Sequence, residues 1–74
     1  MSEYAIEVRR NLGNNVCQFI KQINICYTLE EARKYLNSSL HELQDNEFLS
    51  IVEIIYDDEG NEIGVEYIED TLLN

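Results

Sequence analysis

The chain of 74 residues contains no proline and no tryptophan, and its three glycines, Gly13, Gly60 and Gly64, stand apart from one another. Isolated glycines exclude the glycine-rich loop that cradles a nucleotide phosphate. The apolar runs are also far shorter than the roughly 20 residues that a membrane-spanning helix needs. We therefore expect neither a nucleotide site nor a membrane span.

Histidine and cysteine are scarce as well. His41 is the single histidine, and Cys17 and Cys26 lie nine positions apart, which matches no zinc-binding spacing. No signal peptide precedes the cysteines, so we expect two reduced, buried or half-buried thiols in a cytoplasmic protein. Because neither thiol has a histidine partner in the pattern, we predict no catalytic residue and no enzyme activity.

The acidic segment from Asp57 to Glu62 superficially resembles a calcium loop. An EF-hand loop needs its glycine at position 6, between two helices. Gly60 falls at position 4 counted from Asp57, and the flanking residues have the pattern of strands. We therefore predict no metal and no cofactor.

Basic residues disappear after Lys34. Residues 35–74 hold eleven carboxylates and no lysine or arginine, whereas residues 1–34 hold five basic residues and four acids. The formal net charge of −10 is thus +1 on the first part and −11 on the second. Such a field repels nucleic acid and membranes, and it attracts basic protein surfaces.

Alternation of apolar and polar residues around Tyr4, Ile6 and Val8 predicts a strand at about residues 3–10. Turn chemistry at residues 11–15 leads to a second strand at about 16–27. A four-residue loop would pair Val8 with Cys17 and Ile6 with Phe19, with Cys17, Phe19, Ile23, Ile25 and Tyr27 pointing inward. Lys21 interrupts this inward series, which indicates a bulge or an edge position.

A helix is predicted at about residues 29–44. Thr28 and Glu31 form a capping box, in which the threonine hydroxyl accepts from the Glu31 amide and the glutamate reaches back to the threonine amide. An apolar stripe follows at spacings of 3, 4, 4 and 3 residues. It consists of Leu29, Ala32, Leu36, Leu40 and Leu43.

Two more strands are predicted at about residues 48–56 and 62–69, around a turn at 57–61, before a loose tail at 70–74. Their register pairs Val52 with Tyr67, Ile54 with Val65 and Tyr56 with Ile63, and we assign this face to the core. The order is ββαββ in a single domain, residues 1–74. We therefore predict an α+β fold, in which one helix packs on a face of an antiparallel sheet.

The opposite face of the second hairpin pairs Glu53 with Glu66, next to isoleucines. Like charges directly opposed destabilise a sheet, so a mixed acidic and apolar face is typical of a protein-binding surface. The alternative is that the helix or the first hairpin covers the isoleucines. The candidate partner-binding residues are Ile51, Glu53, Ile55, Asp57, Asp58, Glu59, Glu62, Glu66 and Ile68.

These features predict a non-enzymatic module that docks its acidic second hairpin on a basic, nucleic-acid-binding host protein and inhibits it. In size, acidity and sheet-plus-helix build, the chain resembles small phage-encoded inhibitors such as DNA mimics, anti-restriction and anti-CRISPR proteins. The resemblance implies carboxylates that stand where phosphates would lie. An alternative hypothesis is a self-associating structural or accessory protein, a homodimer formed through the edge of strand 16–27.

Overall fold

The computed structural model describes residues 2–39 and 43–71 and contains four strands and one helix among them. In chain order these are β1 (Ser2–Gly13), β2 (Val16–Cys26), α1 (Leu29–Ser38), β3 (Glu47–Tyr56) and β4 (Glu62–Asp70). The predicted ββαββ order and α+β class are confirmed.

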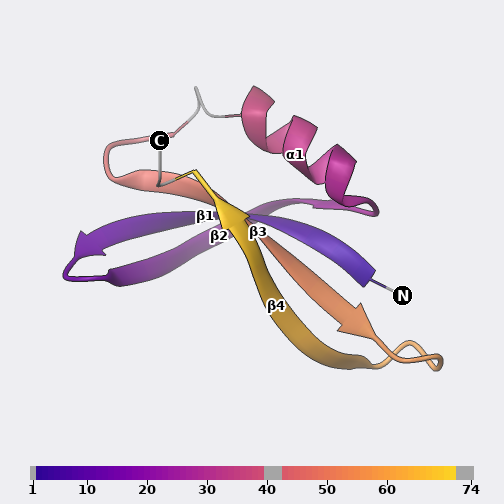
Figure 1. Cartoon of the computed structure of the whole chain (residues 1–74). Coiled ribbons are helices and arrows are strands. Elements are labelled where there is room, and N and C mark those ends of the chain that lie inside the picture. Colours follow the sequence, from indigo (N-terminus) through magenta and orange to yellow (C-terminus); the bar gives the residue numbers. More distant parts are fainter. Residues whose placement is uncertain (1, 40–42, 72–74) are drawn as a thin grey trace.

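The four strands form one antiparallel sheet in the order β2-β1-β3-β4. The two hairpins therefore lie side by side, with β1 and β3 at the centre and β2 and β4 at the edges. Figure 1 shows α1 over one face of the twisted sheet, while the two hairpin turns point away from each other at opposite ends. The molecule is accordingly elongated, with extents of 40, 26 and 19 Å.

The first hairpin turns more tightly than predicted. Only Asn14 and Asn15 separate the strands, with φ angles of 53° and 63°. Two consecutive residues at positive φ are typical of a type I′ turn, which asparagine tolerates. The predicted four-residue loop, and with it the pairing of Val8 with Cys17, is therefore wrong.

The observed register of β1 and β2 pairs Val8 with Lys21 and Ile6 with Asn24. Register shifts lie on both sides of the Lys21–Gln22 segment, and β2 is an edge strand, so both explanations offered for Lys21 are confirmed. The shifts also break the inward series predicted for β2. Cys17, Phe19 and Tyr27 are exposed, whereas Ile20, Ile23 and Cys26 pack toward the helix.

The N-terminus of α1 follows the prediction in part. The Thr28 hydroxyl oxygen accepts from the Glu31 amide at 3.1 Å, as a capping box requires. The Glu31 carboxylate does not complete the box on the Thr28 amide; it lies 3.2 Å from the Thr28 hydroxyl, which donates to it.

The helix ends at Ser38, earlier than the predicted residue 44. The Ser38 hydroxyl donates to the Tyr35 carbonyl at 2.9 Å, and the Ser39 amide donates to the Leu36 carbonyl, closing a tighter turn. Asparagine and serine at 37–39 favour such local bonds over continued helix. Leu40 and His41 lie outside the described residues, and Leu43 packs on the core without being helical.

The core lies between α1 and the sheet. Ala32 and Leu36 from the helix stripe pack on central-strand residues that are almost inaccessible to solvent. These sheet residues are Ile6, Val8, Leu49 and Ile51, with Cys26 from β2. Burial raises the pKa of the Cys26 thiol, and the negative charge of Glu31 adds to that effect.

At the C-terminal end, β4 is one residue longer than predicted. Asp70 belongs to the strand, and Thr71 continues its pairing because its amide donates to the Leu49 carbonyl at 3.0 Å. The Thr71 hydroxyl also accepts from the Leu49 amide at 3.1 Å. The predicted loose tail therefore does not begin at residue 70, and residues 72–74 lie outside the description.

Candidate protein-binding surface

The β3–β4 hairpin carries every predicted partner-binding residue, and its turn projects away from the helix (Figure 1). The turn is built by Asp57. One of its carboxylate oxygens accepts from the amides of Glu59 and Asn61, each at 2.9 Å. These bonds, the one from the Asn61 amide foremost, lower the pKa of Asp57. Asp57 is thus a turn-forming residue before it is a candidate contact.

The predicted cross-strand register is confirmed in the middle of the hairpin. Glu53 pairs with Glu66, Ile54 with Val65 and Val52 with Tyr67. Both ends differ, because a register shift at each end moves the pairing by one residue. Ile51 pairs with Glu69 where Ile68 was predicted, and Tyr56 pairs with Glu62 where Ile63 was predicted.

The two faces of the hairpin are the reverse of the prediction. Ile51 is fully buried beneath α1, and Ile68 packs against the same core. The Val52–Tyr67 and Ile54–Val65 pairs, assigned to the core, lie on the face away from the helix. The alternative interpretation, in which the helix covers the isoleucines, is therefore confirmed for Ile51 and Ile68, and Ile55 is half-buried.

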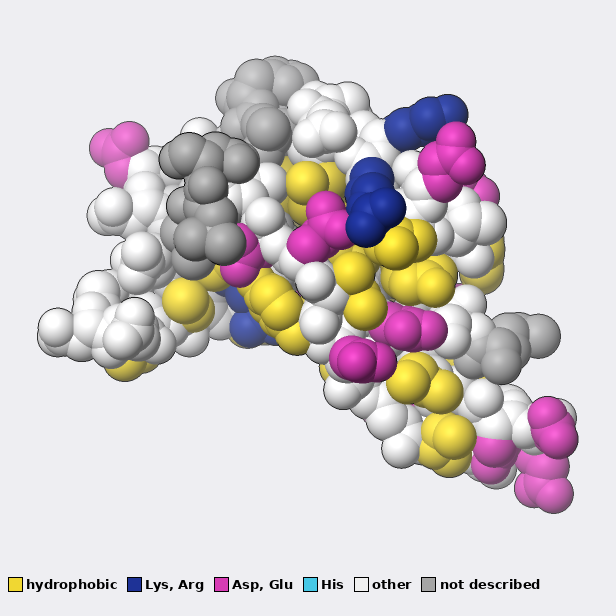
Figure 2. Space-filling model, viewed as in Figure 1, with side chains coloured by type: hydrophobic (Ala, Val, Ile, Leu, Met, Phe, Trp, Pro, Cys, Tyr) yellow, Lys and Arg dark blue, Asp and Glu magenta, His cyan; other side chains and the backbone are white. Residues whose placement is uncertain are grey.

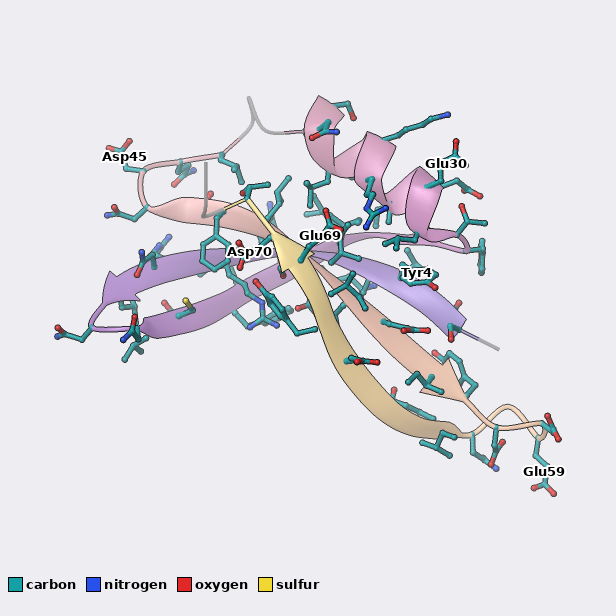
Figure 3. The ribbon with its side chains drawn as sticks, viewed as in Figure 1. Tyr4, Glu30, Asp45, Glu59, Glu69 and Asp70 are labelled. Atoms are coloured by element: carbon teal, nitrogen blue, oxygen red, sulfur yellow. The ribbon has the colours of Figure 1, made fainter. Side chains whose placement is uncertain are left out.

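Besides Asp57, five of the predicted residues are accessible carboxylates without an ion pair to lysine or arginine among residues 2–39 and 43–71. Glu53 is half-buried, and the others are exposed. Figure 2 shows acidic side chains gathered at the tip of this hairpin, and Figure 3 shows Glu59 at its far end. We call this set the acidic ridge: Glu53, Asp58, Glu59, Glu62 and Glu66.

Other carboxylates of the hairpin are paired. Glu69 lies 2.9 Å from the guanidinium Nε of Arg33, which ties β4 to the helix, and Figure 3 shows Glu69 beneath α1. Glu47 lies 3.6 Å from Arg10. Asp70 accepts from the Tyr67 hydroxyl. Burial, followed by the charge and hydrogen bond of Asp70, raises the pKa of Tyr67.

The sheet face away from α1 forms a second surface. Its centre is closed, because Ala5, Ser50 and Val52 are nearly inaccessible. Its edge strands, however, expose large apolar side chains to solvent. Phe19 on β2 is 51% exposed, and Val65 on β4 is 59% exposed. We call this surface the open face: Ala5, Phe19, Ile25, Phe48, Ser50, Val52, Ile54, Val65 and Tyr67.

Sequence reasoning missed the open face as a surface, because alternation alone cannot say which side of a sheet a helix covers. The missed residues include Phe19, Val65 and Tyr67. In the middle of the second hairpin the residues of each face were grouped correctly, but the side was wrong and the pairing at both ends differs. The available signal was that both faces of residues 48–56 are mostly apolar, with only Ser50 on one and Glu53 on the other, since such a run indicates a strand with two sides to cover.

The cysteines do not share a site. Cys17 is exposed near the β1–β2 turn, and Cys26 is buried at the other end of β2. Within the described ranges, no group of three or more His, Cys, Asp or Glu side chains converges as a metal site would require. In the same ranges no helix has the length and apolarity needed to cross a bilayer.

Comparisons with known proteins returned no relative. No family model matches the chain, and neither the curated proteins nor the solved structures contain a significant match.

Proposed function

We propose that this protein is a small non-enzymatic binding module that docks the β3–β4 hairpin on a basic, nucleic-acid-binding protein and inhibits it. The single observation that carries the proposal is the concentration of charge. Residues 47–70 hold nine carboxylates and no basic residue, and the acidic ridge supplies five of them without a partner in the described structure.

The opposed pair Glu53–Glu66 supports a role beyond solubility. Like charges directly across an antiparallel pair destabilise it, and a lysine at either position would relieve the repulsion. A fold optimised for stability alone has no reason to keep this pair. A basic partner that approaches the ridge would compensate both carboxylates at once.

The position of the ridge also suits docking. Asp58, Glu59 and Glu62 lie at the tip of a two-stranded ribbon that projects from the body of the protein, as Figure 3 shows for Glu59. A groove that admits a nucleic-acid strand is lined by lysine and arginine, and such a ribbon would offer carboxylates in place of phosphates. Binding would then exclude the nucleic acid by direct competition.

The test compares charge reversal on the ridge with the same reversal elsewhere. Glu53→Lys with Glu66→Lys changes the ridge, whereas Glu30→Lys with Asp45→Lys changes two exposed carboxylates outside it, which Figure 3 places on α1 and before β3. Both pairs shift the net charge equally. Each protein is first titrated with poly-L-lysine and then with purified nucleic-acid-binding proteins of the host, in the presence or absence of a short DNA duplex.

The expected result is that the ridge variant loses binding, that the control keeps most of it, and that salt and the duplex both weaken the wild-type complex. Equal losses in the two variants would show that net charge alone drives binding, and the proposed docking site would be rejected. Wild-type binding that persists at high salt would reject the charge-based mechanism.

A further inference from the structure

The open face is separate from the Glu53–Glu66 pair of the acidic ridge, because these two residues alternate to the helix side of the hairpin while Val65 and Tyr67 point to the other. We infer that the open face binds a second copy of this chain, so that two sheets stack face to face with their helices outside. The inference is independent of the proposed docking and would hold even if the acidic ridge bound nothing.

The exposed apolar side chains of the open face are the first argument. Phe19 and Tyr67 are each 51% exposed, and Val65 is 59% exposed. Phe19 lies on one edge strand and the other two lie on the opposite edge strand, with the polar side chains of Glu7, Arg9 and Ser50 between them. Exposed apolar side chains on both edges of a face gain free energy when a partner covers them.

The charges of the face point to a partner that is itself apolar and neutral. Arg9 is compensated by Glu7, 2.5 Å away, and its Nε donates to the Ser50 hydroxyl at 3.1 Å. The guanidinium also lies 6.0 Å from the centroid of the Phe19 ring. Tyr67 donates to Asp70 on the same sheet. Because these polar groups already have partners, the centre of the face offers no free carboxylate to a basic protein, and it matches a copy of itself.

The net charge of −10 does not prevent this arrangement. In a stacked dimer Glu53 and Glu66 lie on the outer sides of two sheets that are about 10 Å apart, and Asp58 and Glu59 lie in the turn at the hairpin tip. Carboxylates on the outer sides are separated by more than this spacing and so by more than the Debye length of about 8 Å at physiological salt, and the repulsion between them is largely screened. Added salt should therefore strengthen the dimer, whereas it should weaken docking to a basic protein.

The area that a stable dimer needs is a modest share of the surface of this protein. A stable interface of standard size buries about 800 Å² on each partner. That is roughly a sixth of the accessible surface of 5149 Å², and the two longest extents of the molecule are 40 and 26 Å. The edge of β2, the dimer contact predicted from sequence, is less suitable, because its register shifts interrupt a regular row of backbone donors and acceptors.

The experiment is sedimentation equilibrium of the whole chain from about 1 μM to about 1 mM protein at low and high salt. We expect wild-type mass to rise from 8.7 kDa to twice that value, and to do so at lower concentration in high salt. Val65→Lys should raise the dimer dissociation constant by about tenfold or more, because a lysine would be buried in the interface. Val16→Lys is the matched control. Val16 is a 51% exposed valine on the helix side of β2, so this variant should leave the dimer dissociation constant unchanged.

Thiol labelling gives a second readout that needs no substitution. Cys17 is exposed on β2, two residues before Phe19 and on the same side of the sheet, whereas Cys26 is buried in the core. Dimerisation should slow alkylation of Cys17 as protein concentration rises and leave Cys26 unchanged. A mass of 8.7 kDa at every concentration and salt, or equal effects of Val65→Lys and Val16→Lys, would overturn the inference. Neither result would bear on binding of basic proteins by the acidic ridge.

Discussion

The β1–β2 hairpin ends in the uncharged pair Asn14-Asn15, whereas the β3–β4 hairpin ends in a five-residue turn that holds three carboxylates. The strands differ in the same way. Residues 2–26 carry two acids and three basic residues, and residues 47–70 carry nine acids and no base. In Figure 2 the tip of the second hairpin is acidic, while the opposite end of the sheet has no charged cluster.

The residues that build the core are therefore different from the residues that carry the charge imbalance. Both hairpins contribute a central strand to the same core, through Ile6 and Val8 of β1 and through Leu49 and Ile51 of β3. The charge imbalance lies on residues that the core does not use. The hairpin itself is required by the fold, whereas the carboxylates of the acidic ridge are not part of its core.

The largest difference in stability should be between a variant at a buried position of one hairpin and a variant at an exposed position of the other. Ile51→Ala removes a side chain at 0% exposure from the middle of the acidic hairpin and should lower the free energy of unfolding by about 2–5 kcal/mol. Leu12→Ala, at 55% exposure on the other hairpin, should cost about 0.5 kcal/mol or less. Urea denaturation at matched protein concentration measures both. Similar costs for the two variants would mean that α1 does not cover β3 as described.

Removing the glycine of one turn should destabilise the protein, whereas introducing a glycine into the other turn should stabilise it. Gly60 has a φ of +85° and no atom within 4 Å of an added Cβ, so Gly60→Ala should cost about 1–2 kcal/mol through backbone strain alone. Asn15→Gly, at a φ of 63°, should gain about 0.5 kcal/mol because glycine suits this position of a type I′ turn better. Thermal unfolding followed by circular dichroism measures whether each variant is less or more stable than the wild type. A stabilising Gly60→Ala would contradict the turn geometry.

Repulsion across the acidic hairpin can be isolated by a double-mutant cycle. Glu53→Lys and Glu66→Lys, taken singly, each create an opposite-charge pair and should stabilise the protein by about 0.2–1 kcal/mol. The double variant opposes two lysines and should lose that gain. The single gains should shrink in high salt. Additive effects in the double variant would show that the two side chains do not interact.

The smallest effect is confined to acidic pH. Because the folded-state pKa of Asp57 is lowered by its turn hydrogen bonds, its contribution is present above the unfolded value of about 3.9 and is lost as pH falls through the folded value. Asp57→Asn removes this titration and keeps an acceptor in the turn. The stability of the wild type relative to Asp57→Asn should therefore be constant near neutral pH and decrease below about pH 4. If the stability difference between the wild type and Asp57→Asn stayed constant down to about pH 2, the turn hydrogen bonds would not lower the pKa of Asp57.

Local features were predictable because they depend on neighbouring residues. The alternation around Ile6, the Thr28 cap and the pairing of Glu53 with Glu66 all follow from short-range chemistry. The predictions failed where several weak preferences compete. Asn37, Ser38 and Ser39 end the helix within its apolar stripe, and shifts beside Lys21 change the register of β2.

The amino-acid sequence alone determined the strands, the helix start, the second hairpin's central register and the concentration of charge on that hairpin. The tertiary structure decided which face of the sheet α1 covers. Val52 and Ile54 lie on one face and Ile51 on the other, and both rows are apolar enough to fill a core. The choice depends on how the connection from β2 to β3 passes over the sheet, which is a contact between distant segments. That choice buries Ile51, leaves the open face uncovered and places Glu53 and Glu66 on the opposite side of the sheet.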